Sequence, residues 1–228
     1  MEPLYNISYH FGTDCFANSE LFEDPTEFVR EVRFTVNRID DAGRVLEEVG
    51  KGKFSHILFS LAMDADFPVE WVMDATQSIL NMSEVLFILD EDSGFFDKID
   101  EYFEGDPPMN MNVCFLERLE LLPIHRGKGL TRMILNELAR SYYDCCGLWV
   151  LKAYPLQHNE AASDNQEVAI WREQMGYADM EADFEKAQYK LFHLYQQMGM
   201  VNPFDMSYFI AKPEKLAFIG GKDKEAIK

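Results

Sequence analysis

Residues 111–131 read MNVCFLERLELLPIHRGKGLT, and this stretch decides the fold. Residues 111–122 are largely apolar at both alternating sets of positions, which predicts a strand buried on both faces. Pro123 ends the strand, and a short loop leads into residues 130–142, whose apolar side chains recur at helical spacing. Residues 148–153 (LWVLKA) are a second apolar run of strand length. The order strand, glycine-rich turn, helix, strand predicts a βαβ unit.

The segments before this unit predict antiparallel strands followed by a helix. Apolar and polar residues alternate over 32–36, residues 53–61 are again apolar, and residues 40–43 (DDAG) supply turn chemistry between them. We therefore expect an antiparallel hairpin within residues 30–62. A proline then opens residues 68–80, where the apolar side chains keep helical spacing.

Three further elements complete the expected fold. The sequence predicts a short helix over 95–103, a helix over 166–174 and a final strand over 206–211. Residues 105–108 (GDPP) break the pattern between the two halves of the chain. Together these elements predict an α/β (α+β) fold, with a mixed, mostly antiparallel sheet flanked by helices.

Charge is distributed unevenly along the chain. The 228 residues include 21 Lys and Arg against 40 Asp and Glu, a net charge of -19 that argues against a protein neutralising nucleic-acid phosphates. Residues 1–110 carry 24 acidic and 7 basic side chains, whereas residues 111–152 carry four acidic and six basic ones. We expect an anionic ligand in the second region. The acidic first region favours the approach of a cationic amine, or serves solubility alone.

The composition also bears on compartment and metal content. No apolar run approaches the ~18 to 20 residues that a bilayer crossing needs, and the N-terminus lacks the order of a signal peptide. We expect a soluble, cytoplasmic protein without a membrane partner, whose four cysteines are reduced and structural. Asp90, Asp92 and Glu101 have calcium-loop spacing, but Phe95 stands where that loop needs glycine. No metal is expected.

The turn at residues 125–131 (HRGKGLT) carries the chemistry. Gly127 and Gly129 permit positive φ or a close backbone approach, and the first N–H groups of the following helix carry partial positive charge. Such a turn suits a phosphate or pyrophosphate group. Its spacing fits neither GxxxxGK[ST] nor GxGxxG. We expect His125 to lie exposed in the loop or to touch a phosphate.

In this turn the chain resembles the GNAT superfamily of acyl-CoA-dependent N-acetyltransferases. The family's pyrophosphate motif, Q/R-x-x-G-x-G/A, matches Arg126 and Gly129 in the first and fourth places, while Thr131 stands in the last place. The resemblance implies a pyrophosphate-binding set for acetyl-CoA: Arg126, Gly127, Lys128, Gly129, Leu130 and Thr131. It also implies that the strand residues Leu119, Glu120 and Leu121 hydrogen-bond the pantetheine arm through their backbone.

A second stretch carries the same resemblance. The family's Tyr-x-x-x-Gly-aromatic motif matches Tyr195 and Gly199, with Met200 in the place of the aromatic residue. The resemblance implies that Tyr195 lies beside the CoA sulfur and protonates the departing thiolate. The alternative is that Tyr195 is a core aromatic residue, because Leu191 and Leu194 line the same helix.

Glu117 and Glu120 are the candidates for the general base that deprotonates the amine. An acid on an apolar central strand is costly unless it is paired or functional. Family members place a catalytic glutamate on this strand, and Glu117 is the first choice. Strict alternation puts the two glutamates on opposite faces. The alternative for Glu117 is a salt bridge with Arg118 or Lys152.

These observations predict one GNAT-like domain. It consists of an acidic N-terminal part (1–110), an acetyl-CoA-binding core (111–211) and a flexible tail (212–228). The expected function is transfer of an acetyl group from acetyl-CoA to a primary amine, by direct attack in a ternary complex. The expected acceptor is a small molecule or a peptide, with no nucleic acid as partner, and a homodimer is left open.

The acceptor itself is not identified by the sequence. Residues 157–185 are longer than the connection this family uses, so they are expected to shape the acceptor pocket. Trp171 and Tyr177 are either pocket residues or packing residues. Two other functions stay open. One is a non-catalytic acyl-CoA-binding or regulatory protein of the same fold, and the other is a phosphopeptide or nucleotide binder that uses the same turn.

Overall fold

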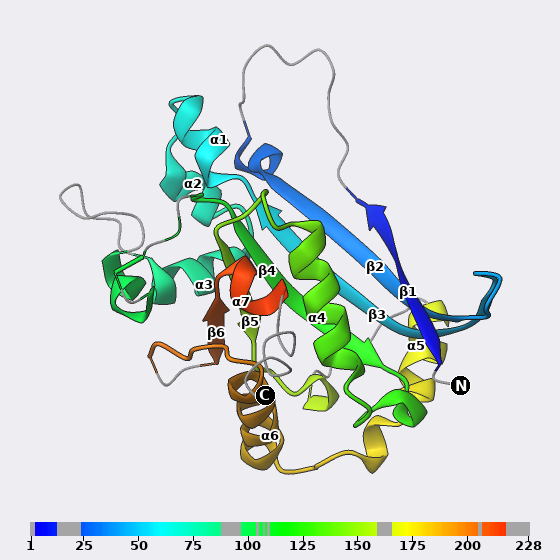
Figure 1. The fold of residues 1–228 in the computed structure, drawn as a ribbon. Coiled ribbons are helices and arrows are strands. Elements are labelled where there is room, and N and C mark those ends of the chain that lie inside the picture. The colour runs from blue at the N-terminus through cyan, green and yellow to red at the C-terminus, as the bar shows by residue number, and fades with distance from the viewer. Residues whose placement is uncertain are drawn as a thin grey trace, which may run out of the picture.

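The computed structural model shows a single β-sheet with helices on both faces (Figure 1). It describes residues 3–12, 24–87, 97–103, 105–106, 108, 110–158, 166–204 and 207–217. The strands lie in chain order: β1 (Leu4–Phe11), β2 (Val29–Ile39), β3 (Val45–Ile57), β4 (Val113–Leu121), β5 (Leu148–Lys152) and β6 (Tyr208–Ala211). Neighbouring strands are antiparallel except β4 and β5, which are parallel. The predicted fold class, a mixed and mostly antiparallel sheet flanked by helices, is confirmed.

The helices are α1 (Phe59–Asp64), α2 (Val69–Met73), α3 (Gln77–Leu86), α4 (Leu130–Ser141), α5 (Gln166–Gln174), α6 (Phe184–Gln197) and α7 (Pro213–Ala217). Short 3₁₀ turns cover Pro25–Phe28, Asp97–Phe103, Pro123–His125, Leu156–His158 and Tyr177–Asp179. The helix predicted over 68–80 is divided into α2 and α3, because Thr76 begins α3 and accepts the N–H of Ile79 at 3.2 Å. The strand predicted over 53–61 ends at Ile57, where α1 follows.

Two apolar cores lie on opposite faces of the sheet. On one face, α4 and α7 cover the strands, with Phe54 and Trp149 fully buried between them; Figure 1 shows α4 crossing this face. On the other face, α1, α2 and α3 pack on Phe115 and Val150. Both β4 and β5 are therefore buried on both sides, as their apolar sequences predict.

β4 contains a bulge at Glu117. On β3, Lys53 pairs with Arg118 and Phe54 pairs with Leu116, so Glu117 has no cross-strand partner. An extra residue in one strand reverses the alternation of side chains beyond it. The second half of β4 therefore presents to each face the residues that strict alternation assigns to the other.

This bulge brings the two candidate bases to one face. Glu117 contacts Lys53 and Glu120 contacts Arg118, and these two cations are cross-strand neighbours. The prediction that Glu117 and Glu120 lie on opposite faces is therefore wrong. It counted residues along one strand, whereas the bulge depends on how that strand pairs with β3.

The end of the described chain is ordered. α7 packs on α4, with Leu216 and Ala217 buried, and Arg140 Nε donates to the carbonyl oxygen of Ala217 at 3.0 Å. The flexible tail expected from residue 212 therefore does not begin there. The remainder of that prediction, residues 218–228, lies outside the described residues.

Gly147, immediately before β5, has no room for a side chain. A Cβ there would lie 1.8 Å from the carbonyl oxygen of Asn110 and 2.8 Å from Cβ of Pro108. We expect Gly147→Ala to lower the free energy of unfolding by about 3 kcal/mol, because backbone atoms must move. In the control Gly12→Ala, the Cβ is 3.4 Å from Glu31, and a change below ~0.5 kcal/mol is expected. Urea unfolding of both variants measures the difference, and equal stabilities would contradict the packing.

Candidate functional site

A cavity of about 470 Å³ opens where β4 and β5 separate. Leu116 with Leu151 is the last parallel pair, and residues 117–121 continue with β3 on one side only. Their other edge therefore presents backbone groups without a strand partner. Much of the lining is apolar: Leu119, Leu121, Leu156, Leu191 and Leu194.

Most of the site residues predicted from the sequence meet in this cavity. Its lining includes Glu117, Leu119, Glu120, Leu121, Arg126, Thr131 and Tyr195. Gly127, Lys128 and Gly129 form the adjoining turn, while the side chain of Leu130 is buried in the core beneath α4. Leu130 can therefore offer a ligand only its backbone.

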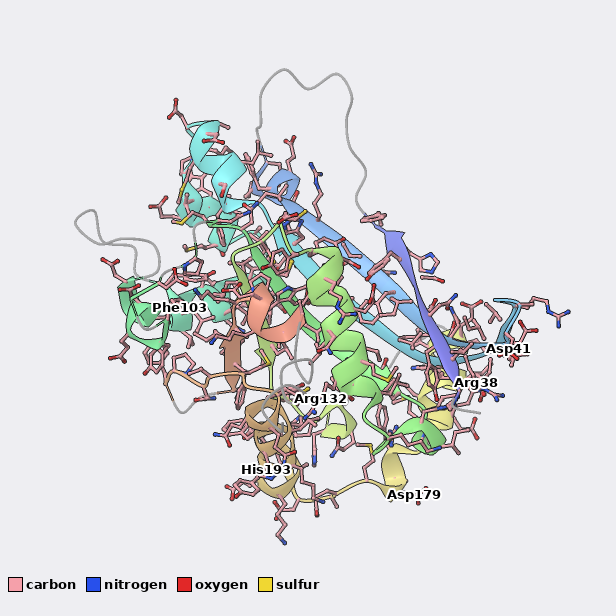
Figure 2. All side chains as sticks on the ribbon, in the orientation of Figure 1. Arg38, Asp41, Phe103, Arg132, Asp179 and His193 are labelled. Atoms are coloured by element: carbon pink, nitrogen blue, oxygen red, sulfur yellow. The ribbon has the colours of Figure 1, made fainter. Side chains whose placement is uncertain are left out.

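Helices α4 and α6 border the cavity and contact each other. Arg132 in the first turn of α4 donates to the carbonyl oxygen of Gln197 at the end of α6, at 3.4 Å. Figure 2 labels Arg132, His193 of α6 and Asp179, and Asp179 also lines the cavity. In that view Arg132 locates α4, His193 locates α6 and Asp179 locates the 3₁₀ turn Tyr177–Asp179.

The N-terminus of α4 is uncapped and open. Gly127 and Gly129 have φ of 69° and 77°, and a Cβ at either would meet nothing within 4 Å. Gly129 is the N-cap, and no side chain caps the helix. The first N–H groups of α4 therefore lack acceptors within the helix and carry its positive partial charge. Thr131 brings this first turn into the cavity lining.

The side chain of Arg126 is engaged with the protein itself. Its Nε donates to the carbonyl oxygen of Leu121 at 2.8 Å, and its Nη2 donates to that of Met175 at 2.7 Å. The guanidinium thus ties the end of β4 to the segment after α5. The backbone N–H of Arg126 also donates to the carbonyl oxygen of Pro123, at 3.2 Å, so Arg126 supports the glycine turn and leaves the N–H groups at the start of α4 to meet an anion.

Tyr195 lies on α6, half-buried, with its ring against Phe209 at 5.3 Å between centroids. Burial raises the pKa of Tyr195 to about 12. Among the described residues, no side chain hydrogen-bonds its hydroxyl. A phenol with this pKa keeps its proton at neutral pH and can donate it to a group that becomes basic in the cavity.

Glu117 stands between two cavities. Ser55 Oγ donates to Glu117 Oε1 at 2.6 Å, and Lys53 Nζ lies 3.4 Å from Oε2. The alternative interpretation of Glu117 named Arg118 or Lys152 as its salt-bridge partner, whereas the partner in the structure is Lys53. Glu117 lines both the first cavity and a second one of about 380 Å³ on the side of β3 and α3. A carboxylate there can reach ligands from both sides.

Glu120 is fully engaged. The carboxylate is buried and accepts hydrogen bonds from Arg118 at 2.9 Å, from Trp171 Nε1 at 3.3 Å and from the Tyr177 hydroxyl. Burial, together with this bond to Glu120, raises the pKa of Tyr177 to about 12. The geometry favours a structural role for Glu120, which joins β4 to the segment 171–177, over the role of general base.

His125 is buried rather than exposed in its loop. Its Nδ1 lies 3.4 Å from the Tyr5 hydroxyl, and its Nε2 lies 3.7 Å from Glu47 Oε1. The exposed position expected from the sequence is therefore wrong. Tyr5 of β1 covers the loop although it lies 120 residues away in the sequence, and no local pattern indicates such a contact.

Sequence reasoning missed part of the second cavity. Tyr154 and Lys152 line both cavities, and Ser78 of α3 lines the second. Lys152 entered the sequence analysis only as a salt-bridge partner. Its charge at the end of an otherwise apolar strand is the signal that could have identified it.

Comparisons with known proteins give only distant likenesses. No protein-family model matches the chain, and no curated protein matches it in sequence. Two structures of KacT, one in a KacTA–DNA complex and one of a mutant, share 9% and 11% identity at a TM-score of 0.38, covering 92% of this chain and 96% of theirs. AtaT complexed with acetyl-methionyl-tRNAfMet shares 8% identity at a TM-score of 0.34, covering 92% of this chain and 97% of its own.

These structures correct one expectation. The prediction that no nucleic acid is a partner is contradicted, because one of these structures is a complex with DNA and another is a complex with a tRNA. The prediction that the acceptor is a small molecule or a peptide is withdrawn for the same reason. The exclusion relied on net charge, which sums over the whole chain and does not describe any single surface.

Every helix among the described residues is too short or too polar to cross a bilayer. In the same part of the chain, no group of three or more His, Cys, Asp or Glu side chains could hold a metal ion.

Removing the buried carboxylate of Glu120 should destabilise the protein. Glu120→Ala leaves Arg118 and two further donors, Trp171 and Tyr177, without their acceptor, and we expect the free energy of unfolding to fall by about 3 kcal/mol. The control Glu137→Ala removes an exposed acid and should change it by less than ~0.5 kcal/mol. Chemical denaturation compares the two, and a Glu120→Ala protein as stable as wild type would contradict the structural role.

Proposed function

We propose that the protein transfers an acetyl group from acetyl-CoA to an amine, by direct attack in a ternary complex. One observation carries the proposal: a single cavity brings together the uncapped N-terminus of α4, the unpaired edge of β4 and the hydroxyl-bearing side chain of Tyr195. These are the parts that an acyl-CoA thioester and its transfer require, namely an anion site, a backbone edge and a proton donor.

The residues fit the parts of acetyl-CoA in order along the cavity. The open N–H groups at the start of α4 suit the pyrophosphate, since nothing fills the space over the two glycines, Gly127 and Gly129. The free edge of residues 119–121 suits the amides of the pantetheine arm. Apolar side chains of α6, Leu191 and Leu194, cover that arm.

The chemistry then divides between Glu117 and Tyr195. The acceptor nitrogen must lose a proton to attack the thioester carbon, and Glu117, fixed by Ser55 and Lys53 where the two cavities meet, is the proposed base. As the new C–N bond forms and the C–S bond breaks, the sulfur leaves as a thiolate. Tyr195 donates its proton to that sulfur. The nitrogen loses a second proton as it becomes an amide, and this proton restores the Tyr195 hydroxyl, while Glu117 returns the first proton to solvent.

Gly129→Val should weaken acetyl-CoA binding. The variant places a branched side chain at φ 77° over the proposed pyrophosphate site, and we expect a loss of at least about tenfold in affinity by calorimetry. Gly43→Val is the matched control, because Gly43 has φ 76° and equally open surroundings in a hairpin turn far from the cavity. Wild-type affinity in Gly129→Val would refute the assignment of the turn.

Tyr195→Phe should separate binding from turnover. We expect acetyl-CoA affinity to stay within about twofold and turnover to fall by roughly 10²-fold or more, because the proton donor is lost. Tyr189→Phe, an exposed tyrosine on the same helix, should change neither quantity. Release of free CoA reports turnover. Binding of acetyl-CoA without turnover by wild type against any amine would favour a non-catalytic acyl-CoA-binding protein instead.

A further inference from the structure

Lys152 stands at the junction of the two cavities. It is the last residue of β5 and follows the last parallel pair, Leu116 with Leu151. Glu117 is the first residue of β4 beyond the same pair. The two opposite charges therefore lie on either side of the opening between the strands, and both line both cavities.

The ammonium of Lys152 has no carboxylate partner among the described residues. The other two cations of the second cavity, Lys53 and Arg118, are each held by a glutamate, at 2.8 Å and 2.9 Å. The Lys152 Nζ instead lies 5.8 Å and 5.7 Å from the ring centres of Tyr154 and Tyr208. An anionic group of a ligand gains more electrostatic free energy from a partly buried cation than from a cation in water.

We propose that the second cavity takes an acceptor whose reacting amine lies within a few bonds of an anionic carboxylate or phosphate group. The anionic group binds Lys152, and the amine lies at Glu117. This inference rests on the proposed function and names the class of acceptor for the same site.

The position of Lys152 separates this anion from those of the cofactor. The proposed pyrophosphate site begins beyond Leu121, whereas Lys152 lies level with Glu117. Four residues of strand span roughly 13 Å, so one phosphate group cannot occupy both places. The second cavity, on the side of β3 and α3, is the space that Lys152 can serve besides the cofactor cavity.

A third cavity continues the cationic lining. It has a volume of about 440 Å³ and shares Lys53 and Arg118 with the second. Five Lys and Arg line it against three Glu, in a chain where acidic residues outnumber basic ones by 40 to 21. Four of these five cations are paired with a glutamate: Arg33, Lys51, Lys53 and Arg118. Lys152 differs from them because it has no carboxylate partner among the described residues.

The test compares matched amines on the protein saturated with CoA, which binds without turnover. Calorimetry measures the affinities of glycine against glycinamide and of O-phosphoethanolamine against ethanolamine. We expect at least one anionic member to bind about tenfold more tightly than its neutral partner. Preference in the first pair alone identifies a carboxylate, and preference in the second alone a phosphate.

Variants of Lys152 make the preference specific to this residue. Lys152→Met should abolish it, Lys152→Glu should reverse it, and Lys152→Arg should retain it because the charge is kept. Lys215→Met, an exposed lysine on α7, should leave it unchanged. Each variant is judged by the ratio of the affinities of the two amines in one pair. The basicities of the two amines are the same for every variant, so a change in this ratio reports the substitution alone.

The outcomes separate this inference from the proposed function. Equal binding within both pairs, no binding of either anionic member, or a preference that survives in Lys152→Met would overturn the acceptor class while leaving acetyl-CoA binding intact. Failure of wild type to bind acetyl-CoA or CoA would overturn both. A Lys152→Met protein that does not fold leaves Lys152→Arg and Lys152→Glu to decide by the same ratio.

Discussion

The site depends on one constraint, the separation of β4 from β5 after the pair Leu116 and Leu151. A parallel pair that continued would fill the edge of β4 with a neighbouring strand and leave no cavity. Because β5 turns away at Lys152, residues 117–121 keep β3 on one side and face an open space on the other. The other walls of the cavity, α4 and α6, therefore lie along the free edge of β4.

The bulge at Glu117 converts this opening into a polar junction. Without the extra residue, strict alternation would send one of the two glutamates toward the core beneath α4. With the bulge, both glutamates lie on one face of the sheet, where their contacts differ. Glu120 accepts hydrogen bonds from three donors and thereby holds the segment 171–177. Glu117 has two partners, Ser55 and Lys53, and borders both cavities.

Local patterns predicted the architecture well. Pro123, the two glycines of the turn and the apolar stripe of α4 are encoded within some thirty residues, and the structure places them as expected. The burial of His125 by β1, the bulge opposite Phe54 and the cavity lining of Tyr154 depend on segments far apart in the chain. Such features follow from pairing and packing, and periodicity in one segment carries no information about them.

Arg126 and Glu120 give the site a further property. Both reach across about fifty residues, to Met175 and to Trp171, and so close one side of the cavity. Neither Met175 nor Trp171 belongs to the two apolar cores that pack on the sheet. Damage to the segment after α5 should therefore lower ligand affinity while the core of the protein stays folded.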